Sequence, residues 1–206
     1  MNAAERYLGS LLLILSAGFI FICFRRRIRL SFTTLELTTG AFLICLMYVS
    51  VTPWSISLSK VPGIDALVFS IPYTAVLLIG LQLVPKAGMA TLLIAGHGLL
   101  GQLTGRGLNP VWWPYYLMCG LAVELIFLAS GCAFRRLYIA ILIAMARAGI
   151  AYVYMYYVLA PFVWHKFYPD WYICSKAAFG IVGSIAGAYM AWKIAPTVDK
   201  LSKVYI

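Results

Sequence analysis

Long apolar runs are the feature of this sequence that most constrains its fold. Runs of roughly 17 to 25 mainly apolar residues are long enough to cross the hydrocarbon core of a bilayer as α-helices. The chain contains seven such runs: Leu8–Phe24, Leu35–Val51, Asp65–Leu83, Ala87–Leu103, Pro114–Ser130, Leu137–Val163 and Tyr172–Ile194. The sequence therefore predicts an all-α, polytopic membrane bundle.

Composition and charge agree with that prediction. The chain is 64% hydrophobic and 11% charged, whereas a soluble domain has about 25% charged residues. Its net charge of +10 comes from short basic clusters between the apolar runs, a pattern that sets membrane topology and does not require a nucleic-acid partner. The most basic loop, RRRIR, separates the first run from the others. We expect an anchor helix with its basic loop at residues 1–30 and a six-helix membrane domain at residues 31–206.

Lysine and arginine residues fall mainly on one side of the predicted membrane. Ten lie in one set of alternate loops and in the C-terminal tail: Arg25, Arg26, Arg27, Arg29, Lys86, Arg135, Arg136, Lys193, Lys200 and Lys203. Four lie on the other side: Arg6, Lys60, Arg106 and Lys166. Because the richer side faces the cytoplasm, we expect a cell-membrane protein with its N-terminus outside and its C-terminus cytoplasmic. The first run is followed by FRRRIR, with no small-residue cleavage site, so it should remain as an anchor.

Few residues suit cofactor, metal or catalytic chemistry. The five cysteines lie in or beside apolar runs without CxxC spacing, and only His97 and His165 could add imidazole ligands. A phosphate-binding glycine loop of the Walker type is also missing from the sequence. We therefore expect no cofactor, no metal site and no enzymatic activity, since neither a nucleophile–base pair nor a metal cluster is apparent.

Three ionisable residues lie deep within the predicted helices. Glu124 is about ten residues from the adjacent tryptophans, and Arg147 and His97 are about ten residues from the basic loops, so a helical rise of 1.5 Å per residue places all three near the bilayer midplane. Such groups face the bundle interior and usually pair. Two interpretations are open: a Glu124–Arg147 ion pair that fixes helix packing, or the polar floor of a ligand pocket. Gly96, Gly98 and Gly120 beside these groups favour the pocket, because small residues leave room.

Aromatic and glycine patterns add further candidates. Tyr154 lies on the same helical face as Arg147, towards the predicted outer surface. The tryptophans near that surface are typical of a membrane-interface belt, but above a polar floor they would also suit a flat, partly charged organic ligand. Gly183 and Gly187 have GxxxG spacing, which permits a close helix contact either within the bundle or with another subunit.

The central part of the chain resembles the substrate-binding S components of energy-coupling factor (ECF) transporters, with thiamine-precursor members the nearest likeness. The likeness rests on the PK-x-G turn at Pro85–Gly88, the Gly/Pro-rich outer loop and the G-x-x-x-E-x-x-F pattern at Gly120–Phe127. It covers about a third of the chain closely. The resemblance implies a six-helix body that binds a vitamin or vitamin precursor beneath its outer loops and that is coupled to a transmembrane T subunit and ATPase subunits.

The resemblance also implies roles for individual residues. Glu124, Arg147 and His97 would be polar pocket groups, and Asn109, Trp112 and Trp113 would belong to an outer lid. Ala41 and Cys45 stand where family members carry an AxxxA pattern that docks the T subunit. The glycines and aromatics of the outer loop, GRGLNPVWWP, predict that it moves as a lid. The competing hypothesis is a non-catalytic helical subunit of a larger respiratory or membrane monooxygenase complex.

Overall fold

The computed structural model describes residues 17–18, 31–57, 63–131 and 136–205, and within these ranges the chain is helical and contains no strand. Six helices form the body: α2 (Thr34–Ser57), α3 (Ile64–Leu83), α4 (Met89–Gly101), α5 (Trp113–Ala129), α6 (Leu137–Val153) and α8 (Asp170–Tyr205). Shorter elements join them: η1 (Gln102–Arg106), η2 (Pro110–Trp112), η3 (Tyr154–Leu159) and α7 (Ala160–Phe162). The prediction of an all-α bundle is confirmed. The predicted anchor run 8–24 lies outside the described residues except for 17 and 18, which are helical.

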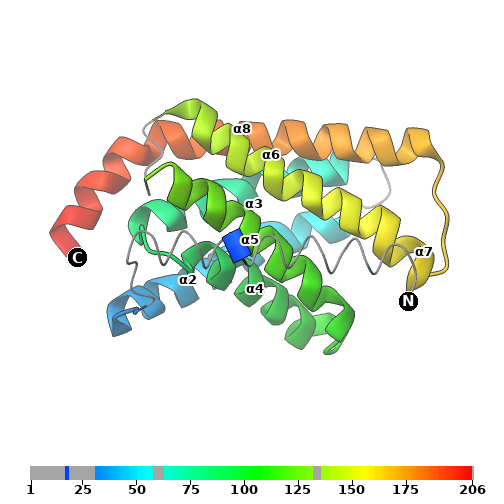
Figure 1. Cartoon of the computed structure of the whole chain (residues 1–206), viewed down its shortest axis with the longest axis horizontal. Helices are drawn as coiled ribbons and strands as arrows, with labels where there is room; N and C mark the ends of the chain where they lie inside the picture. Colours follow the sequence, from blue (N-terminus) through cyan, green and yellow to red (C-terminus); the bar gives the residue numbers. More distant parts are fainter. Residues whose placement is uncertain (1–16, 19–30, 58–62, 132–135, 206) are drawn as a thin grey trace.

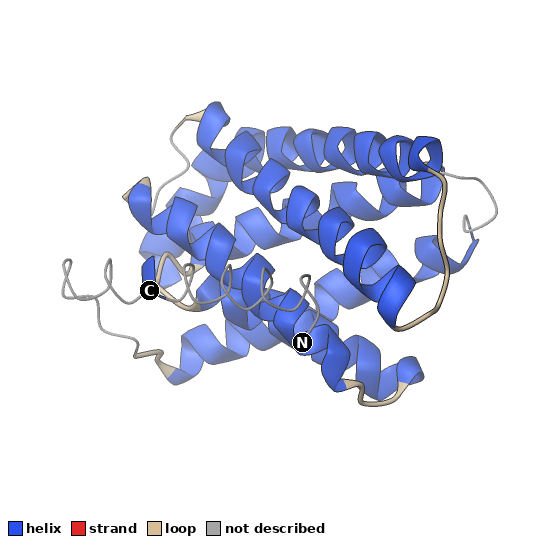
Figure 2. Ribbon diagram, turned by 45° about the vertical axis from the view of Figure 1, so that its right-hand side comes forward, coloured by secondary structure: helices blue, strands red, loops and turns tan. Residues whose placement is uncertain are grey.

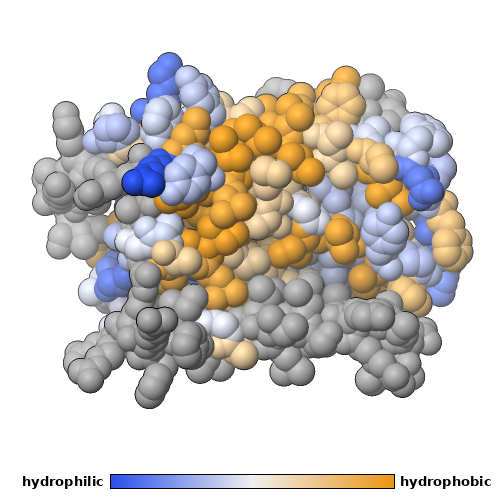
Figure 3. Space-filling model, turned by 45° about the horizontal axis from the view of Figure 1, so that its top comes forward, coloured by the Kyte–Doolittle hydropathy of each residue, from blue (hydrophilic) through white to orange (hydrophobic). Residues whose placement is uncertain are grey.

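Five of the described helices are long and apolar enough to cross a membrane. The exception is α4, where the sequence predicts a full span at Ala87–Leu103. Its α-helical part has only 13 residues, or about 20 Å, and it continues as the π-helical turn η1. Figure 3 shows a broad apolar band across one face, with polar residues at both ends. These features indicate a multi-pass membrane protein.

The six helices pack as a closed ring (Figures 1 and 2). In order around the ring, the neighbours are α2, α3, α8, α6, α5 and α4, and α4 returns to α2. Helices that are adjacent in the chain run in opposite directions, so each end of the ring collects one set of connections. We call the end where α2, α4 and α6 finish and α3, α5 and α8 begin the pocket end, on the right in Figure 1. The opposite end, with the α3–α4 and α5–α6 turns, is the closed end.

The interior towards the closed end is filled by large apolar side chains that are fully buried. They come from five of the six helices and include Met47, Leu77, Leu81, Met89, Leu93, Phe127, Leu128 and Ile143. A filled interior of this kind has the packing density of an organic crystal and leaves no space for a solute. The space available to a ligand is therefore restricted to the pocket end.

The GxxxG residues Gly183 and Gly187 lie in the contact between α8 and α3. A Cβ atom at Gly183 would lie 2.4 Å from the carbonyl oxygen of Leu67, and one at Gly187 would lie 2.3 Å from that of Ile71. The prediction that these glycines dock a partner subunit is therefore wrong. The backbones approach so closely that only glycine fits, and the contact closes the ring within one chain.

Candidate functional site

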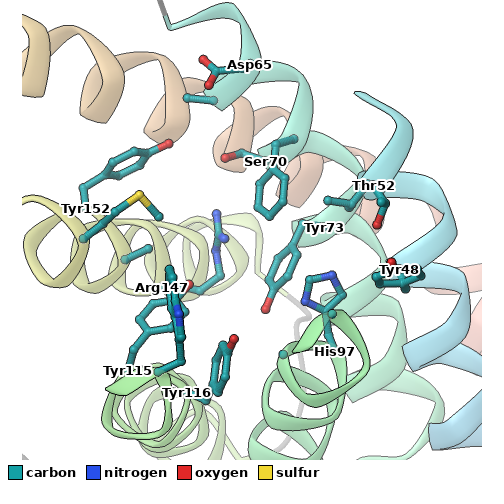
Figure 4. Close-up of a pocket in the computed structure, with 18 of the residues that line it drawn as sticks. Tyr48, Thr52, Asp65, Ser70, Tyr73, His97, Tyr115, Tyr116, Arg147 and Tyr152 are labelled. Atoms are coloured by element: carbon teal, nitrogen blue, oxygen red, sulfur yellow. The ribbon is translucent and has the colours of Figure 1, made fainter. Parts of the chain in front are cut away.

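A pocket of about 610 Å³ lies inside the ring at the pocket end (Figure 4). All six main helices or their short extensions contribute to its wall. Aromatic side chains dominate: Tyr48, Phe69, Tyr73, Trp112, Tyr115, Tyr116, Tyr152 and Tyr156. The polar lining residues are Thr52, Asp65, Ser70, His97, Gln102, Thr104, Arg147 and Lys176. The lining therefore combines aromatic walls with polar and charged groups, and its volume is within the range of small-molecule pockets.

Arg147 on α6 is a buried charged group in this wall. Its side chain is buried, and its guanidinium lies 4.7 Å from the centre of the Tyr73 ring. One terminal nitrogen, Nη2, donates a hydrogen bond of 2.7 Å to Ser184 Oγ, whereas the buried Nε has no partner. Within the described part of the chain, no carboxylate lies within ion-pair distance of Arg147. The sequence-based prediction that Arg147 lies in a pocket is thus consistent with the structure.

A second charged group at the pocket rim is internally balanced. Lys176 on α8 forms an ion pair with Asp65 Oδ2 on α3, and its ammonium also lies 5.6 Å from the centre of the Tyr172 ring. The other carboxylate oxygen, Asp65 Oδ1, is buried without a hydrogen-bond partner. Because the two charges cancel, this pair leaves the Arg147 cation uncompensated.

His97 on α4 faces the pocket as predicted. Its imidazole ring meets Tyr73 edge to face with ring centres 5.0 Å apart, and the Tyr48 ring lies 6.3 Å away. Figure 4 shows His97 between these two tyrosines, across the pocket from Arg147. The histidine is therefore placed in an aromatic part of the wall, where its ring offers both a flat face and nitrogen atoms.

Glu124 does not join this site, and both interpretations drawn from the sequence are wrong for it. The fully buried carboxylate accepts backbone hydrogen bonds from Gly88 (2.8 Å), Ala90 (3.0 Å) and Thr91 (3.4 Å) at the start of α4. Gly88 has a φ angle of 94° and no side chain to cap the helix, so Glu124 supplies the cap from α5. An anion is favoured at a helix N-terminus by the unpaired N–H groups and the helix dipole.

The depth assigned to Glu124 also changes. The residue lies five positions before α5 ends at Ala129, at the closed end, beside the α3–α4 turn. Counting inward from the tryptophans places Glu124 near the middle of an average span. However, α5 has only 17 residues, and its C-terminal part lies against the α3–α4 turn. The same turn is held by Lys86, which pairs with Glu36 at 2.8 Å. The Lys86–Glu36 ion pair and the backbone hydrogen bonds to Glu124 fasten α2, α4 and α5 together here.

The glycines near the predicted polar floor also have a different role. A Cβ atom at Gly98 would lie 2.2 Å from the Tyr116 ring, one at Gly96 would lie 2.3 Å from Ile44, and one at Gly120 would lie 2.8 Å from Thr91 Cα. Neighbouring protein groups already occupy the space beside each of them. The absence of a side chain therefore permits close packing of α4 against α2 and α5, and only Gly98 also borders the pocket.

The loop 102–113, which the sequence predicts to be on the outer side, contributes one predicted lid residue to the pocket. Trp112 lines it and stacks near Tyr116, with ring centres 6.4 Å apart. Trp113 does not line the pocket; like Trp112 it packs against the apolar core, and it meets Tyr116 edge to face. Asn109 does not line the pocket. It caps η2 by accepting a hydrogen bond from the Val111 N–H, and its backbone exchanges two hydrogen bonds with Gln102.

Tyr154, the remaining predicted site residue, is likewise a structural contact. Its hydroxyl donates a hydrogen bond to the Val111 carbonyl oxygen, and its ring stacks on Tyr115. This contact ties the outer loop to η3. Movement of the loop as a lid stays a prediction, and any such movement would have to break the Tyr154 and Gln102 contacts.

Several pocket residues are absent from the candidates chosen by sequence. They include Tyr73 on α3, Tyr115 and Tyr116 on α5, and Tyr152 and Tyr156 near η3. Tyr156 lies within the π-helical turn Tyr154–Leu159, where a regular helical spacing projected from Arg147 no longer applies. The high density of tyrosine in residues 152–157 could have indicated an aromatic pocket wall. Tyrosines near a membrane surface are also typical of an interface belt, so the sequence alone did not distinguish the two.

Ala41 and Cys45 lie on the exposed face of α2. Phe42, Leu46 and Val49 are exposed on the same helix. This face is available to lipid or to a partner helix, so the docking prediction for Ala41 and Cys45 stays a prediction.

Within the described ranges, no group of three His, Cys, Asp or Glu side chains could hold a metal ion. No protein family, curated protein or solved structure matches this chain.

Proposed function

We propose that this chain is the membrane-embedded solute-binding subunit of an ECF-type importer for a small organic micronutrient, a vitamin or vitamin precursor. The observation that carries the proposal is the aromatic pocket inside the helix ring, with a volume of about 610 Å³. Pockets of about 300 to 1,000 Å³ that combine aromatic walls with a few polar groups suit small organic ligands.

The two ends of the ring support binding from one side. The closed end is filled by apolar side chains and fastened by the Lys86–Glu36 pair, whereas the pocket end carries the connections 102–113 and 163–169. The excess of Lys and Arg in the opposite loops supports an outward-facing pocket. A solute would enter from outside, the direction that an importer requires.

The resemblance to S components supplies the expected partners. A transmembrane T subunit would contact the exposed face of α2 at Ala41 and Cys45, and two ATPases would drive transport. The protein would have no catalytic activity of its own. The competing hypothesis, a helical subunit of a larger respiratory or monooxygenase complex, predicts instead that the chain is unstable without its partners and binds no solute.

The test is purification of the chain alone in detergent, followed by denaturation and mass spectrometry of any small molecule released. We expect a monomer that carries about one molecule of an organic compound and that melts at a lower temperature once the compound is removed. Tyr73→Ala should lose the compound, and Phe162→Ala, an exposed aromatic outside the pocket, should keep it. A chain that degrades without partners and releases nothing would support the competing hypothesis.

A further inference from the structure

We infer that the ligand of this pocket is an organic anion with a flat ring, and that Arg147 pairs with its carboxylate. The inference deepens the proposed function and rests on it, because it assumes that the pocket holds a solute. It starts from the charge of Arg147 at the cavity wall, which no acidic side chain in the described part of the chain pairs with.

The acidic side chains described in the structure are all committed elsewhere. Glu36 pairs with Lys86, and Asp65 pairs with Lys176. Glu124 accepts three backbone hydrogen bonds at the closed end, and Asp170 is exposed at the start of α8. A buried arginine in a membrane protein usually pairs with an acidic group. Here the missing counter-charge is one negative charge, which a carboxylate would supply.

The guanidinium is held in one orientation before any ligand arrives. Ser184, itself fully buried, fixes Nη2 from the α8 side, and the Tyr73 ring lies against the guanidinium at 4.7 Å. A guanidinium has five N–H donors in a rigid fork, and the Nε donor is buried without a partner. A carboxylate can accept two parallel hydrogen bonds from such a fork. Figure 4 shows the guanidinium extending into the space between Tyr152 and Tyr73.

The rest of the pocket suits a ring attached to that carboxylate. Tyr115, Tyr116 and Trp112 of η2 and α5 line the wall, together with His97 of α4 and Tyr73 of α3. Aromatic walls bind flat rings by offset stacking and edge-to-face contact. The Lys176–Asp65 pair at the rim adds no net charge, so the pocket selects a single negative charge at Arg147.

The experiment measures three pairs of probes, each a carboxylate and its uncharged amide: benzoate and benzamide, nicotinate and nicotinamide, and indole-3-acetate and indole-3-acetamide. Binding to the purified, ligand-depleted chain is followed by the shift in melting temperature and by titration. The compound released on denaturation is also examined in both ion polarities. The variants are Arg147→Gln and Arg147→Lys, with Arg136→Gln as the control, because Arg136 is an exposed arginine at the start of the same helix.

We expect a released compound that carries a carboxylate, and acid probes that bind more tightly than their amides to wild type and to Arg136→Gln. Arg147→Gln should weaken acid binding at least about 30-fold, the effect of removing one partner of a buried charge pair. Arg147→Lys keeps the charge but loses the fork, so it should bind with an intermediate affinity, and it carries the test if Arg147→Gln does not fold.

Two other outcomes overturn the inference in different ways. A bound compound that is neutral or cationic, or amides that bind as tightly as acids, would refute the inference that the ligand is an anion. The proposal that the chain binds a solute would still stand. No released compound and no stabilising probe would refute the proposed function itself, and the inference with it.

Discussion

The closed end and the pocket end of this bundle each contain a deeply buried charged side chain, and the two have opposite surroundings. At the closed end, the Glu124 carboxylate accepts three backbone hydrogen bonds at the start of α4. At the pocket end, the Arg147 guanidinium has one side-chain partner, Ser184, and an unpaired Nε atom. From the sequence, both residues are lone charges near the middle of an apolar run.

The difference shows how to separate a structural charge from a binding group. A buried charge whose hydrogen-bonding capacity is filled by the protein stabilises the fold, because removing it leaves the partners unsatisfied. A buried charge with vacant capacity beside a cavity costs stability in the empty protein and recovers that cost when a ligand supplies the missing group. Glu124 belongs to the first kind, and we propose that Arg147 belongs to the second.

The largest expected effect comes from Glu124→Gln. The amide presents an NH₂ group to backbone N–H donors that need an acceptor, so the free energy of unfolding in detergent should fall by about 2 to 4 kcal/mol. Solute affinity of the molecules that remain folded should change little, since Glu124 lies outside the pocket. Thermal melting and titration measure the two quantities.

Asp170→Asn is the control for this change, because Asp170 is an exposed acid in the first turn of α8. Adding Arg147→Leu to Glu124→Leu should not restore stability. Recovery to the wild-type melting temperature in that double variant would mean that the two charges do compensate each other, and the contrast between the ends would collapse.

The next effect concerns the α3–α8 contact that closes the ring. Gly187→Ala places a methyl group 2.3 Å from the carbonyl oxygen of Ile71, and relief of that overlap should cost about 1 to 3 kcal/mol of stability. Gly149→Ala is a matched control on α6, because nothing lies within 4 Å of its Cβ position. There the change should stabilise by up to about 1 kcal/mol through helix propensity. Equal melting temperatures for the two variants would argue against the close contact.

The adjacent tryptophans of the outer loop test the boundary of the pocket end. Trp112→Ala should weaken solute binding about tenfold, since an aromatic wall is lost, and that corresponds to about 1.4 kcal/mol. Trp113→Ala should mainly lower the melting temperature, because this ring packs on the core, as Trp112 also does, but does not line the pocket. Titration of both variants with the co-purified compound measures the difference. Loss of binding in Trp113→Ala but not in Trp112→Ala would contradict the assignment of Trp112 as the tryptophan that contacts the solute.

The smallest expected change in stability is that of Arg147→Leu in the ligand-free protein. It tests most directly whether Arg147 differs from Glu124. Removing an uncompensated charge favours the fold, whereas loss of the Ser184 hydrogen bond and the Tyr73 contact opposes it. The net change in the free energy of unfolding should therefore stay within about 1 kcal/mol. The measurement is thermal melting after ligand removal. A loss as large as that of Glu124→Gln would show that Arg147 is a structural group.

Helix positions could be predicted closely from the sequence because they depend on local apolar length. The run Asp65–Leu83 corresponds to α3 at Ile64–Leu83, and the run Pro114–Ser130 to α5 at Trp113–Ala129. Arg147, His97 and Trp112 were also identified correctly as lining a common space. The prediction was less accurate for α4, which is shorter than its apolar run, and for α8, which continues past Pro196 to Tyr205.

The amino-acid sequence by itself determined that this chain forms membrane-spanning helices, since the cost of placing unpaired backbone in lipid leaves long apolar segments no other choice. It also determined that the lone ionisable groups need partners. Only the tertiary structure decided which partners they have. Glu124 meets a helix N-terminus 34 to 36 positions away in the chain, and Arg147 meets Ser184 and Tyr73 on helices brought together by the ring. Spacing within one helix fixes the depth and face of a side chain, but its neighbours across the bundle depend on how six helices close around a common interior.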